Sequence, residues 1–274
     1  MLNLMYITNR PDIAQIAEAA GVDRIFVDLE YIGKSARQGG MDTVQSHHTI
    51  DDVKQVSDAI TKAQLLVRVN PIHEETKHYI SSEEEISRVI ENGANIVMLP
   101  FFKTVNEVKR FVHIVDGRAK TMLLVETPEA VDIIDNILEM DGIDNLHIGL
   151  NDLSLAYQKK FMFELLTDGT VERLCNKFKH AGVPYGFGGI AAIGKGAIPA
   201  EMIIKEHYRL GSTCAILSRS FCDTEKMDKM DDIRSVFMNG LKEIRALEET
   251  CMTHIAYFNQ NKKLLSGMVE AFVK

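Results

Sequence analysis

Two carboxylates at the ends of apolar, strand-like runs are the residues best placed to do chemistry in this chain. Glu126 closes the run T-M-L-L-V-E, and Asp152 follows the run N-L-H-I-G-L-N. Because the carboxyl ends of parallel strands meet at one face of an α/β protein, we expect the two side chains to lie together there. Carboxylate oxygens are the ligands that hard divalent cations prefer. The pair therefore predicts a metal-dependent enzyme.

Helix capping is the alternative role for both carboxylates, since an acidic residue after a strand often only caps the next helix. Glu126 is not needed for capping, because Thr127 and Pro128 supply a cap and a first-turn proline. Asp152, in N-D-L-S, is as compatible with capping a short helix as with binding a metal. The two residues together favour the metal site more than either does alone.

Strand-like and helix-like runs alternate along most of the chain, and this alternation must position the two carboxylates. Several helical runs end in glycine, as at Gly21, Gly93, Gly117, Gly182 and Gly211, which suits a left-handed helix stop. The repeat of about 30 residues is that of a βα unit. Eight such units predict an α/β fold, a (β/α)8 TIM barrel. The eight strand-like runs are Leu2–Thr8, Arg24–Glu30, Gln64–Asn70, Asn95–Pro100, Thr121–Glu126, Asn145–Leu150, Pro184–Gly188 and Thr213–Ser218.

An open, doubly wound sheet is the alternative architecture, but no G-x-G-x-x-G motif follows the first strand. We expect residues 1–225 to form the barrel and residues 226–274 to form additional C-terminal helices. The apolar positions of this extension, from Ile233 to Phe272, need to be buried. They are expected to pack on a neighbouring subunit of a homo-oligomer or on the lower face of the barrel.

Composition narrows the classes of function. The 274 residues carry a net charge of −8 without a basic stretch, which argues against nucleic-acid binding and leaves small polar substrates. No apolar run approaches the roughly 18 residues of a membrane span, and the amino terminus lacks the pattern of a signal peptide. The four cysteines show no C-x-x-C spacing. These observations predict a reduced, cytoplasmic protein that does not enter membranes.

Arg68 lies in an otherwise apolar run, L-L-V-R-V-N-P. A buried guanidinium is costly unless it is paired with an anion, and two interpretations follow. In the first, Arg68 faces an oxygen of the substrate. In the second, it pairs with Asp28 or Glu30 and holds the second strand in place.

Two loops are candidates for binding. The loop from Tyr31 to Thr49 is long and polar and contains His47 and His48, and an imidazole is a common acid or base near neutral pH. The glycine-rich segment from Gly186 to Gly196 brings bare backbone close to the top of the barrel. That segment is compatible with phosphate binding and equally with close backbone packing.

Taken in order, five motifs carry a family resemblance: V-D-L-E, V-R-V-N-P, G-A-N-I-V-M-L-P, V-E-T-P-E-A-V and G-L-N-D-L-S. The chain resembles the HpcH/HpaI aldolase and citrate lyase β-subunit family of the pyruvate/phosphoenolpyruvate barrel superfamily over roughly residues 1 to 222. Each motif alone is weak, whereas the ordered set is fairly specific.

The resemblance implies a barrel in which Glu126 and Asp152 hold a divalent metal, Mg²⁺ or Mn²⁺. Arg68 then lies against the keto or enolate oxygen of a 2-oxo acid. The backbone amides from Gly149 through Leu150 and Asn151 to Asp152 receive its carboxylate. We also place Glu30, at the end of the second strand, among the substrate-binding residues.

This chain departs from the family pattern after the second strand. The aldolase branch has a histidine in E-H-A-P-N, where this chain has E-Y-I-G-K beginning at Glu30. The D-L-E-D continuation of the citrate lyase branch is absent as well. The proton-transfer group is therefore open among a metal-bound water, His47, His48 and Tyr31.

The sequence thus predicts a metal-dependent carbon–carbon lyase that cleaves or forms a 4-hydroxy-2-oxo acid through a pyruvate enolate. Two alternatives stay open. One is an acyl-CoA lyase of the citrate or malyl-CoA lyase type, which would bind CoA. The other is a non-catalytic family member that acts as a ligand sensor or an assembly subunit.

Overall fold

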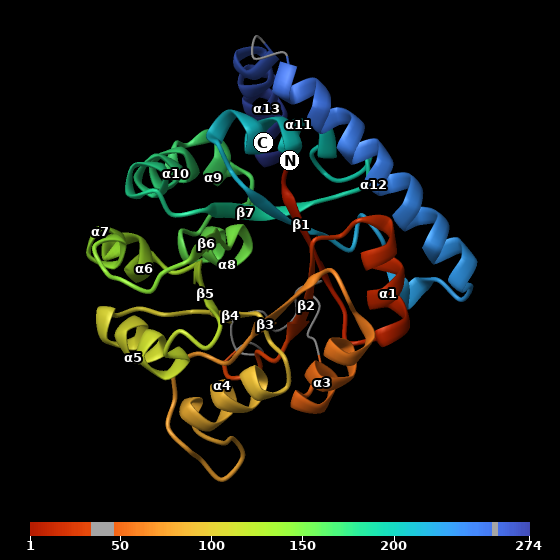
Figure 1. The fold of residues 1–274 in the computed structure, drawn as a ribbon. Helices are drawn as coiled ribbons and strands as arrows, with labels where there is room; N and C mark the ends of the chain where they lie inside the picture. Colours follow the sequence, from red (N-terminus) through yellow and green to blue (C-terminus); the bar gives the residue numbers. More distant parts are fainter. Residues whose placement is uncertain (34–46, 254–256) are drawn as a thin grey trace.

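Eight parallel strands pair in chain order, and the first also pairs with the last, so that the sheet closes into a barrel (Figure 1). The computed structural model describes residues 1–33, 47–253 and 257–274. The strands are β1 (Asn3–Ile7), β2 (Arg24–Asp28), β3 (Gln64–Arg68), β4 (Ile96–Leu99), β5 (Lys120–Val125), β6 (Asn145–Ile148), β7 (Tyr185–Ile190) and β8 (Cys214–Leu217). The (β/α)8 barrel predicted from the sequence is confirmed.

Helices surround the barrel and lie outside the strands (Figure 1). In chain order they are α1 (Pro11–Ala20), α3 (Ile50–Ala59), α4 (Ser82–Glu91), α5 (Val105–Val115), α6 (Pro128–Asp132), α7 (Ile134–Leu138), α8 (Leu150–Ala156), α9 (Glu164–Thr167), α10 (Thr170–Ala181), α11 (Ala200–Leu210), α12 (Met230–Thr253) and α13 (Tyr257–Val273), with a 3₁₀ turn at Thr224–Lys226. The glycines predicted to stop helices adopt positive φ, for example +100° at Gly21 and +72° at Gly182.

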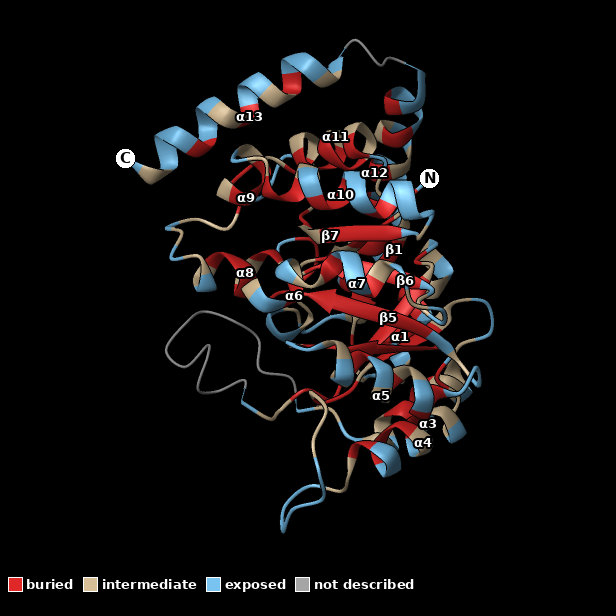
Figure 2. Ribbon diagram, turned by 90° about the vertical axis from the view of Figure 1, so that its left-hand side faces the viewer, coloured by how far each residue is buried: buried red, intermediate tan, exposed pale blue. Residues whose placement is uncertain are grey.

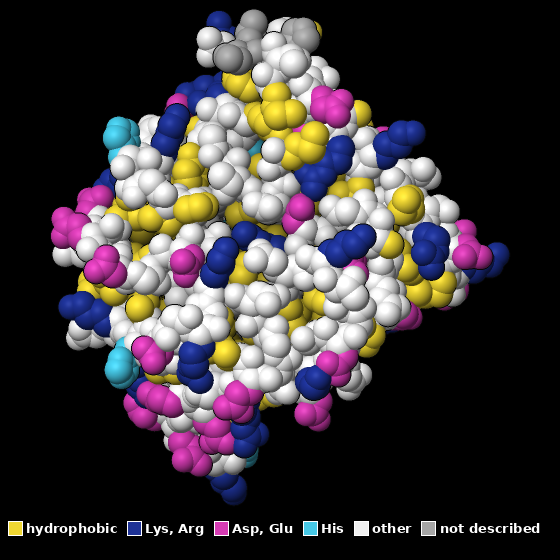
Figure 3. Space-filling view, viewed as in Figure 1, with side chains coloured by type: hydrophobic (Ala, Val, Ile, Leu, Met, Phe, Trp, Pro, Cys, Tyr) yellow, Lys and Arg dark blue, Asp and Glu magenta, His cyan; other side chains and the backbone are white. Residues whose placement is uncertain are grey.

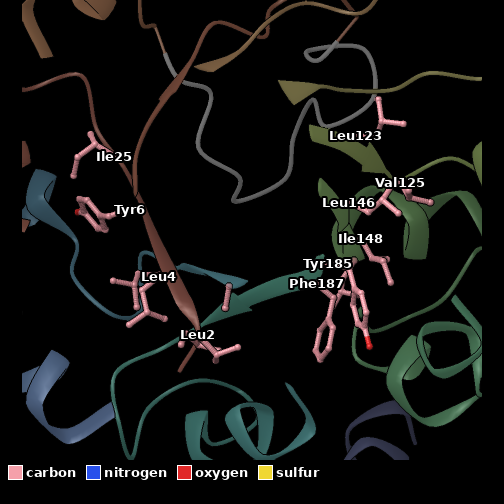
Figure 4. Close-up of a cluster of buried hydrophobic side chains, with 14 of the residues drawn as sticks. Leu2, Leu4, Tyr6, Ile25, Leu123, Val125, Leu146, Ile148, Tyr185 and Phe187 are labelled. Carbon is pink, nitrogen blue, oxygen red and sulfur yellow. The ribbon is translucent and has the colours of Figure 1, made fainter. Parts of the chain in front are cut away.

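Two layers of apolar side chains hold the barrel, because successive residues of a strand point to opposite faces. Met5 on β1 belongs to the layer inside the barrel, with Phe26, Leu66 and Met98. Leu2, Leu4 and Tyr6 belong to the outer layer, under the helices (Figure 4). Figure 2 shows the strands almost wholly buried between the helices. The interior layer therefore supports the side chains at the carboxyl ends of the strands.

The C-terminal helices pack on their own barrel. α12 lies against α1 and α11, and α13 lies against α11 and α9 (Figures 1 and 2). On α12, the fully buried carboxylate of Glu248 accepts hydrogen bonds from the backbone N–H of Leu2 at 2.6 Å and the hydroxyl of Tyr208 at 3.0 Å. These bonds tie α12 to the first strand and to α11.

Some apolar side chains of the extension are exposed, among them Leu264 and Phe272 on α13. The homo-oligomer expected from the sequence stays a prediction. The face at the amino-terminal ends of the strands carries acidic and basic side chains interspersed (Figure 3). Within the described residues, no helix combines the length and apolarity needed to cross a membrane.

Candidate active site

Two adjoining cavities lie at the carboxyl ends of the strands, where barrels carry their chemistry. The inner cavity has a volume of about 210 Å³ and is lined by Glu126, Asp152 and Arg68, among others. The outer cavity, of about 480 Å³, extends over the ends of β1 and β8. Arg68, Asn151, Met162 and Ile216 line both cavities. A ligand in the inner cavity can therefore extend into the outer one.

The structure brings the two predicted metal-binding carboxylates to one cavity. Glu126 directly follows β5, and Asp152 lies in the first turn of α8, after β6. Both are buried, at 3% and 8% exposure. The N-cap of α8 is Gly149, and Thr127 caps α6 by accepting a hydrogen bond from Ala130 at 3.1 Å. Neither carboxylate is therefore the N-cap of its helix.

The surroundings of Glu126 fit a bound cation. Its Oε1 accepts a hydrogen bond from the backbone N–H of Phe101 at 3.0 Å, which orients the carboxylate. A Cβ added at Gly149 would lie only 2.8 Å from its Oε2, so the glycine keeps space beside that oxygen. Within residues 1–33, 47–253 and 257–274, His, Cys, Asp and Glu form no cluster of three that could hold a metal ion. Mg²⁺ typically binds to one or two carboxylates, and oxygens of water and substrate complete its ligand set.

The structure shows the pairing role of Arg68, and its contact with a substrate oxygen stays a prediction. Its Nε and Nη2 donate to the two carboxylate oxygens of Asp28 at 2.8 and 2.7 Å, and its Nη1 lies 3.4 Å from Glu30. Its side chain, 14% exposed, also lines both cavities. Burial by itself lowers the pKa of the guanidinium, but the charges of Asp28, Glu30 and Glu126 outweigh it and raise the pKa above its usual value. Arg68 is thus a fixed positive charge at the cavity wall.

The three side chains considered for proton transfer, besides a metal-bound water, are placed differently. His48 lines the outer cavity, and its Nδ1 accepts a hydrogen bond from the backbone N–H of Asp28 at 3.0 Å. Tyr31 donates its hydroxyl to the backbone carbonyl of His48 at 2.9 Å, and burial, followed by the charge of Asp28, raises its pKa. His47 is exposed, with its ring 6.1 Å from that of Tyr31. Residues 34–46 of the predicted binding loop lie outside the described residues.

The predicted substrate-binding residues divide into two groups. Gly149, Leu150 and Asn151 line the inner cavity beside Asp152. Glu30 lines neither cavity and lies behind Arg68, where it is 1% exposed.

His147 and Met162 are among the residues of the inner cavity that were not predicted from the sequence. His147 stands two positions before Gly149 on β6, so strand periodicity places it on the same inner face. Its position in N-L-H-I-G, two residues before the glycine, could therefore have predicted a place at the cavity. Met162 follows α8 in a segment without periodicity, and no sequence signal places it at the cavity.

The glycine-rich segment contributes Gly188 and Gly189 to the inner cavity. Further along, Lys195 and Gly196 line an open cavity of about 670 Å³ that shares Arg219 with the outer cavity. Phosphate binding by this segment stays a prediction.

Solved structures with the same fold include two proteins described as HpcH/HpaI aldolases and a macrophomate synthase. An HpcH/HpaI aldolase/citrate lyase family protein from Burkholderia cenocepacia has a TM-score of 0.63 at 14% identity, covering 85% of this chain and 94% of that chain. An HpcH/HpaI aldolase from Desulfitobacterium hafniense has a TM-score of 0.60 at 17% identity, covering 89% and 93%. Macrophomate synthase has a TM-score of 0.55 at 15% identity, covering 80% and 77%. At these identities the likeness shows the fold alone.

The family is shown by the sequence itself. No curated protein matches the chain at a significant level. A family model described as HpcH/HpaI aldolase/citrate lyase matches residues 3–182, which is more than half of the 274 residues. This stretch includes Arg68, Glu126 and Asp152, the charged residues of the inner cavity. The chain therefore belongs to the HpcH/HpaI aldolase/citrate lyase family.

Proposed function

We propose that this protein is a divalent-metal-dependent carbon–carbon lyase that cleaves or forms a 4-hydroxy-2-oxo acid, with pyruvate or a close relative as one product. The observation that carries the proposal is that Glu126, Asp152 and Arg68 line one cavity at the carboxyl ends of the barrel strands. Membership of an aldolase and lyase family supports the same class of reaction.

The carboxylates would hold Mg²⁺ or Mn²⁺, which when bound supplies Lewis-acid chemistry to the carbonyl of the substrate. During cleavage, the bond between C3 and C4 breaks and its electron pair moves toward the C2 carbonyl, so that negative charge develops on that oxygen. Arg68, held by Asp28, presents a fixed positive charge to the cavity and stabilises this charge. The C4 hydroxyl gives its proton to a base and becomes the carbonyl of the aldehyde, and the enolate then takes up a proton at C3 to give pyruvate.

Placement supports His48 over His47 and Tyr31 as the side chain that meets the reacting hydroxyl. His48 lines the outer cavity together with Arg68 and Asn151. The aldehyde half of the substrate would extend into this cavity. The carboxylate of the pyruvoyl half would lie near Leu150 and Asn151, whose N–H groups begin α8 and are not capped by a side chain.

The test is exchange of the methyl protons of pyruvate in deuterated water with added Mg²⁺ or Mn²⁺, because it requires enolisation but no aldehyde. We expect Glu126→Gln and Asp152→Asn each to slow exchange by at least about 100-fold, since charge stabilisation at the reacting oxygen is lost. A chelator should abolish exchange by the wild type, and added metal should restore it.

Glu129→Gln is the matched control, because Glu129 follows closely in sequence but is exposed and pairs only at the surface with Lys103 at 3.1 Å. Its exchange rate should equal that of the wild type. Urea unfolding of each variant shows whether the fold is retained. Exchange that persists at the wild-type rate in both folded cavity variants would refute the proposed roles.

A further inference from the structure

His147 is an unusual residue for the inside of this barrel. It is 1% exposed and lines the inner cavity beside the apolar side chains of Phe26, Met98 and Leu124. A polar group is costly to bury unless it is hydrogen-bonded. The partners of its two ring nitrogens therefore indicate what the residue does.

Both nitrogens have partners that fit one tautomer. Nε2 lies 3.2 Å from the backbone carbonyl oxygen of Gly188, and Nδ1 lies 3.9 Å from Sγ of Cys214. A carbonyl only accepts, so Nε2 carries the hydrogen and donates it, and the thiol of Cys214 donates to Nδ1. Burial, and secondarily the charges of Arg24 and Arg68, lower the pKa of His147 to about 4. The ring is therefore neutral at physiological pH.

The carbonyl that His147 holds belongs to an irregular part of the cavity wall. Gly188 has a φ of +52°, and the register between β7 and β8 shifts between Gly186 and Gly189. A Cβ added at Gly188 would lie 2.6 Å from Cδ1 of Leu150, the first residue of α8. The end of β7 thus packs directly on the helix whose first turn carries Asp152.

We propose that His147 is a positioning residue for the 2-oxo acid. Through its hydrogen bond to Gly188 it holds the end of β7 against the start of α8, and this contact sets the shape of the inner cavity beside Asp152. The inference rests on the proposed function for the identity of the ligand, while the hydrogen bond itself can be tested without it.

The test compares two variants in the pyruvate exchange assay. His147→Phe keeps a ring of similar shape but cannot donate to Gly188, and we expect it to raise the KM for pyruvate by roughly tenfold while kcat stays within about threefold. His147→Gln keeps an amide donor and should return KM to within about threefold of the wild type. The pH profile of kcat should be unchanged in both, because the neutral ring transfers no proton.

Equal KM values for wild type and His147→Phe, or equal losses in both variants, would overturn the positioning role. Nitrogen NMR of the wild type gives a second measurement that needs no variant to fold. It should show the hydrogen of His147 on Nε2, and a hydrogen on Nδ1 would overturn the inference. If the wild type catalyses no exchange, the proposed function fails by itself, and the inference is then judged by the tautomer and by calorimetric titration of the same variants with pyruvate.

Discussion

At the scale of single residues, the site depends on a partly buried positive charge, that of Arg68, which Asp28 holds in place. Arg68 was expected either to face the substrate or to pair with Asp28 or Glu30, and its geometry combines a bidentate pair with a place in the cavity wall. The pair orients the guanidinium before any ligand arrives. Electrostatic stabilisation by such a preorganised group needs no rearrangement during the reaction.

Removing this charge should destabilise the protein as well as the site. In Arg68→Met, the carboxylates of Asp28 and Glu30, each 1% exposed, would lose their cationic partner. We expect the free energy of unfolding in urea to fall by about 3 kcal/mol or more. Arg110→Met is the control, because Arg110 pairs with exposed acids at the surface and should cost less than about 1 kcal/mol. A similar loss in both variants would contradict this account.

Two residues that follow strands were predicted correctly to lie together, although His147, on β6 itself, was not singled out. Glu126 and Asp152 were found because each follows a recognisable apolar run, and they line the same cavity. His47 and His48 were not separable, because the direction of a side chain in a long loop depends on contacts such as the bond from Asp28 to His48. Met162 was missed for the same reason.

At the scale of elements, β7 is the strand that departs most from regular structure. A Cβ added at Gly186 would lie 2.2 Å from the backbone oxygen of Cys214 on β8. Close packing of two backbones therefore requires this glycine. Close packing is one of the two interpretations, beside phosphate binding, that the sequence left open for the segment. The same close approach brings Cys214 within reach of His147.

Two glycine substitutions should separate packing from backbone conformation. Gly186→Ala must displace a backbone atom, and we expect a loss of more than about 2 kcal/mol in the free energy of unfolding. At Gly182, an added Cβ would have no atom within 4 Å, but the backbone φ is +72°. Gly182→Ala should therefore lower the free energy of unfolding by about 1 kcal/mol, the cost of a left-handed backbone at alanine. Urea unfolding measures both, and an equal loss would show that the contact at Gly186 relaxes easily.

Many element boundaries were predictable, because the strands are continuous apolar runs and α1, α10 and α11 end at glycines with positive φ. The helix boundaries after Thr127 were less predictable. There the chain forms two short helices, α6 and α7, which meet at Ile133. Apolar periodicity does not reveal such a break, because both helices bury residues of one continuous pattern.

At the scale of the whole molecule, closure of the barrel was predictable because eight βα units in a chain of this length have few other arrangements. The placement of the last two helices was not. Apolar spacing shows that one face of a helix must be buried, but it does not show which element buries that face. In the structure, hydrogen bonds from Leu2 and Tyr208 to the buried Glu248 fix the position of α12 on the barrel.

The stability of the whole molecule should depend on pH through a histidine outside the site. His207 is fully buried, stacks on Phe187 at 3.9 Å and bonds to Ser212. Burial lowers its pKa from 6.5 to about 3, with a smaller contribution from the neighbouring His147 once that ring is protonated. Between these two values the unfolded chain binds a proton that the native state does not, so stability falls as the pH drops below about 6.5.

For His207 alone, we expect a loss of about 2 kcal/mol between pH 7 and pH 5. The measurement is urea unfolding at both pH values in the wild type and in His207→Gln, which cannot titrate in this range. The variant should lose less stability on acidification by about that amount. Identical losses would show that His207 is protonated in the native state.

The burial of every thiol offers a practical use of this fold. All four cysteines are at most 4% exposed, and burial raises the pKa of each thiol. Thiolates are the species that alkylating reagents attack, so the native protein should resist maleimide labelling at neutral pH. A cysteine introduced at the exposed position of Glu129 would then be labelled selectively, and a fluorophore could be placed near the cavity without first removing the natural cysteines.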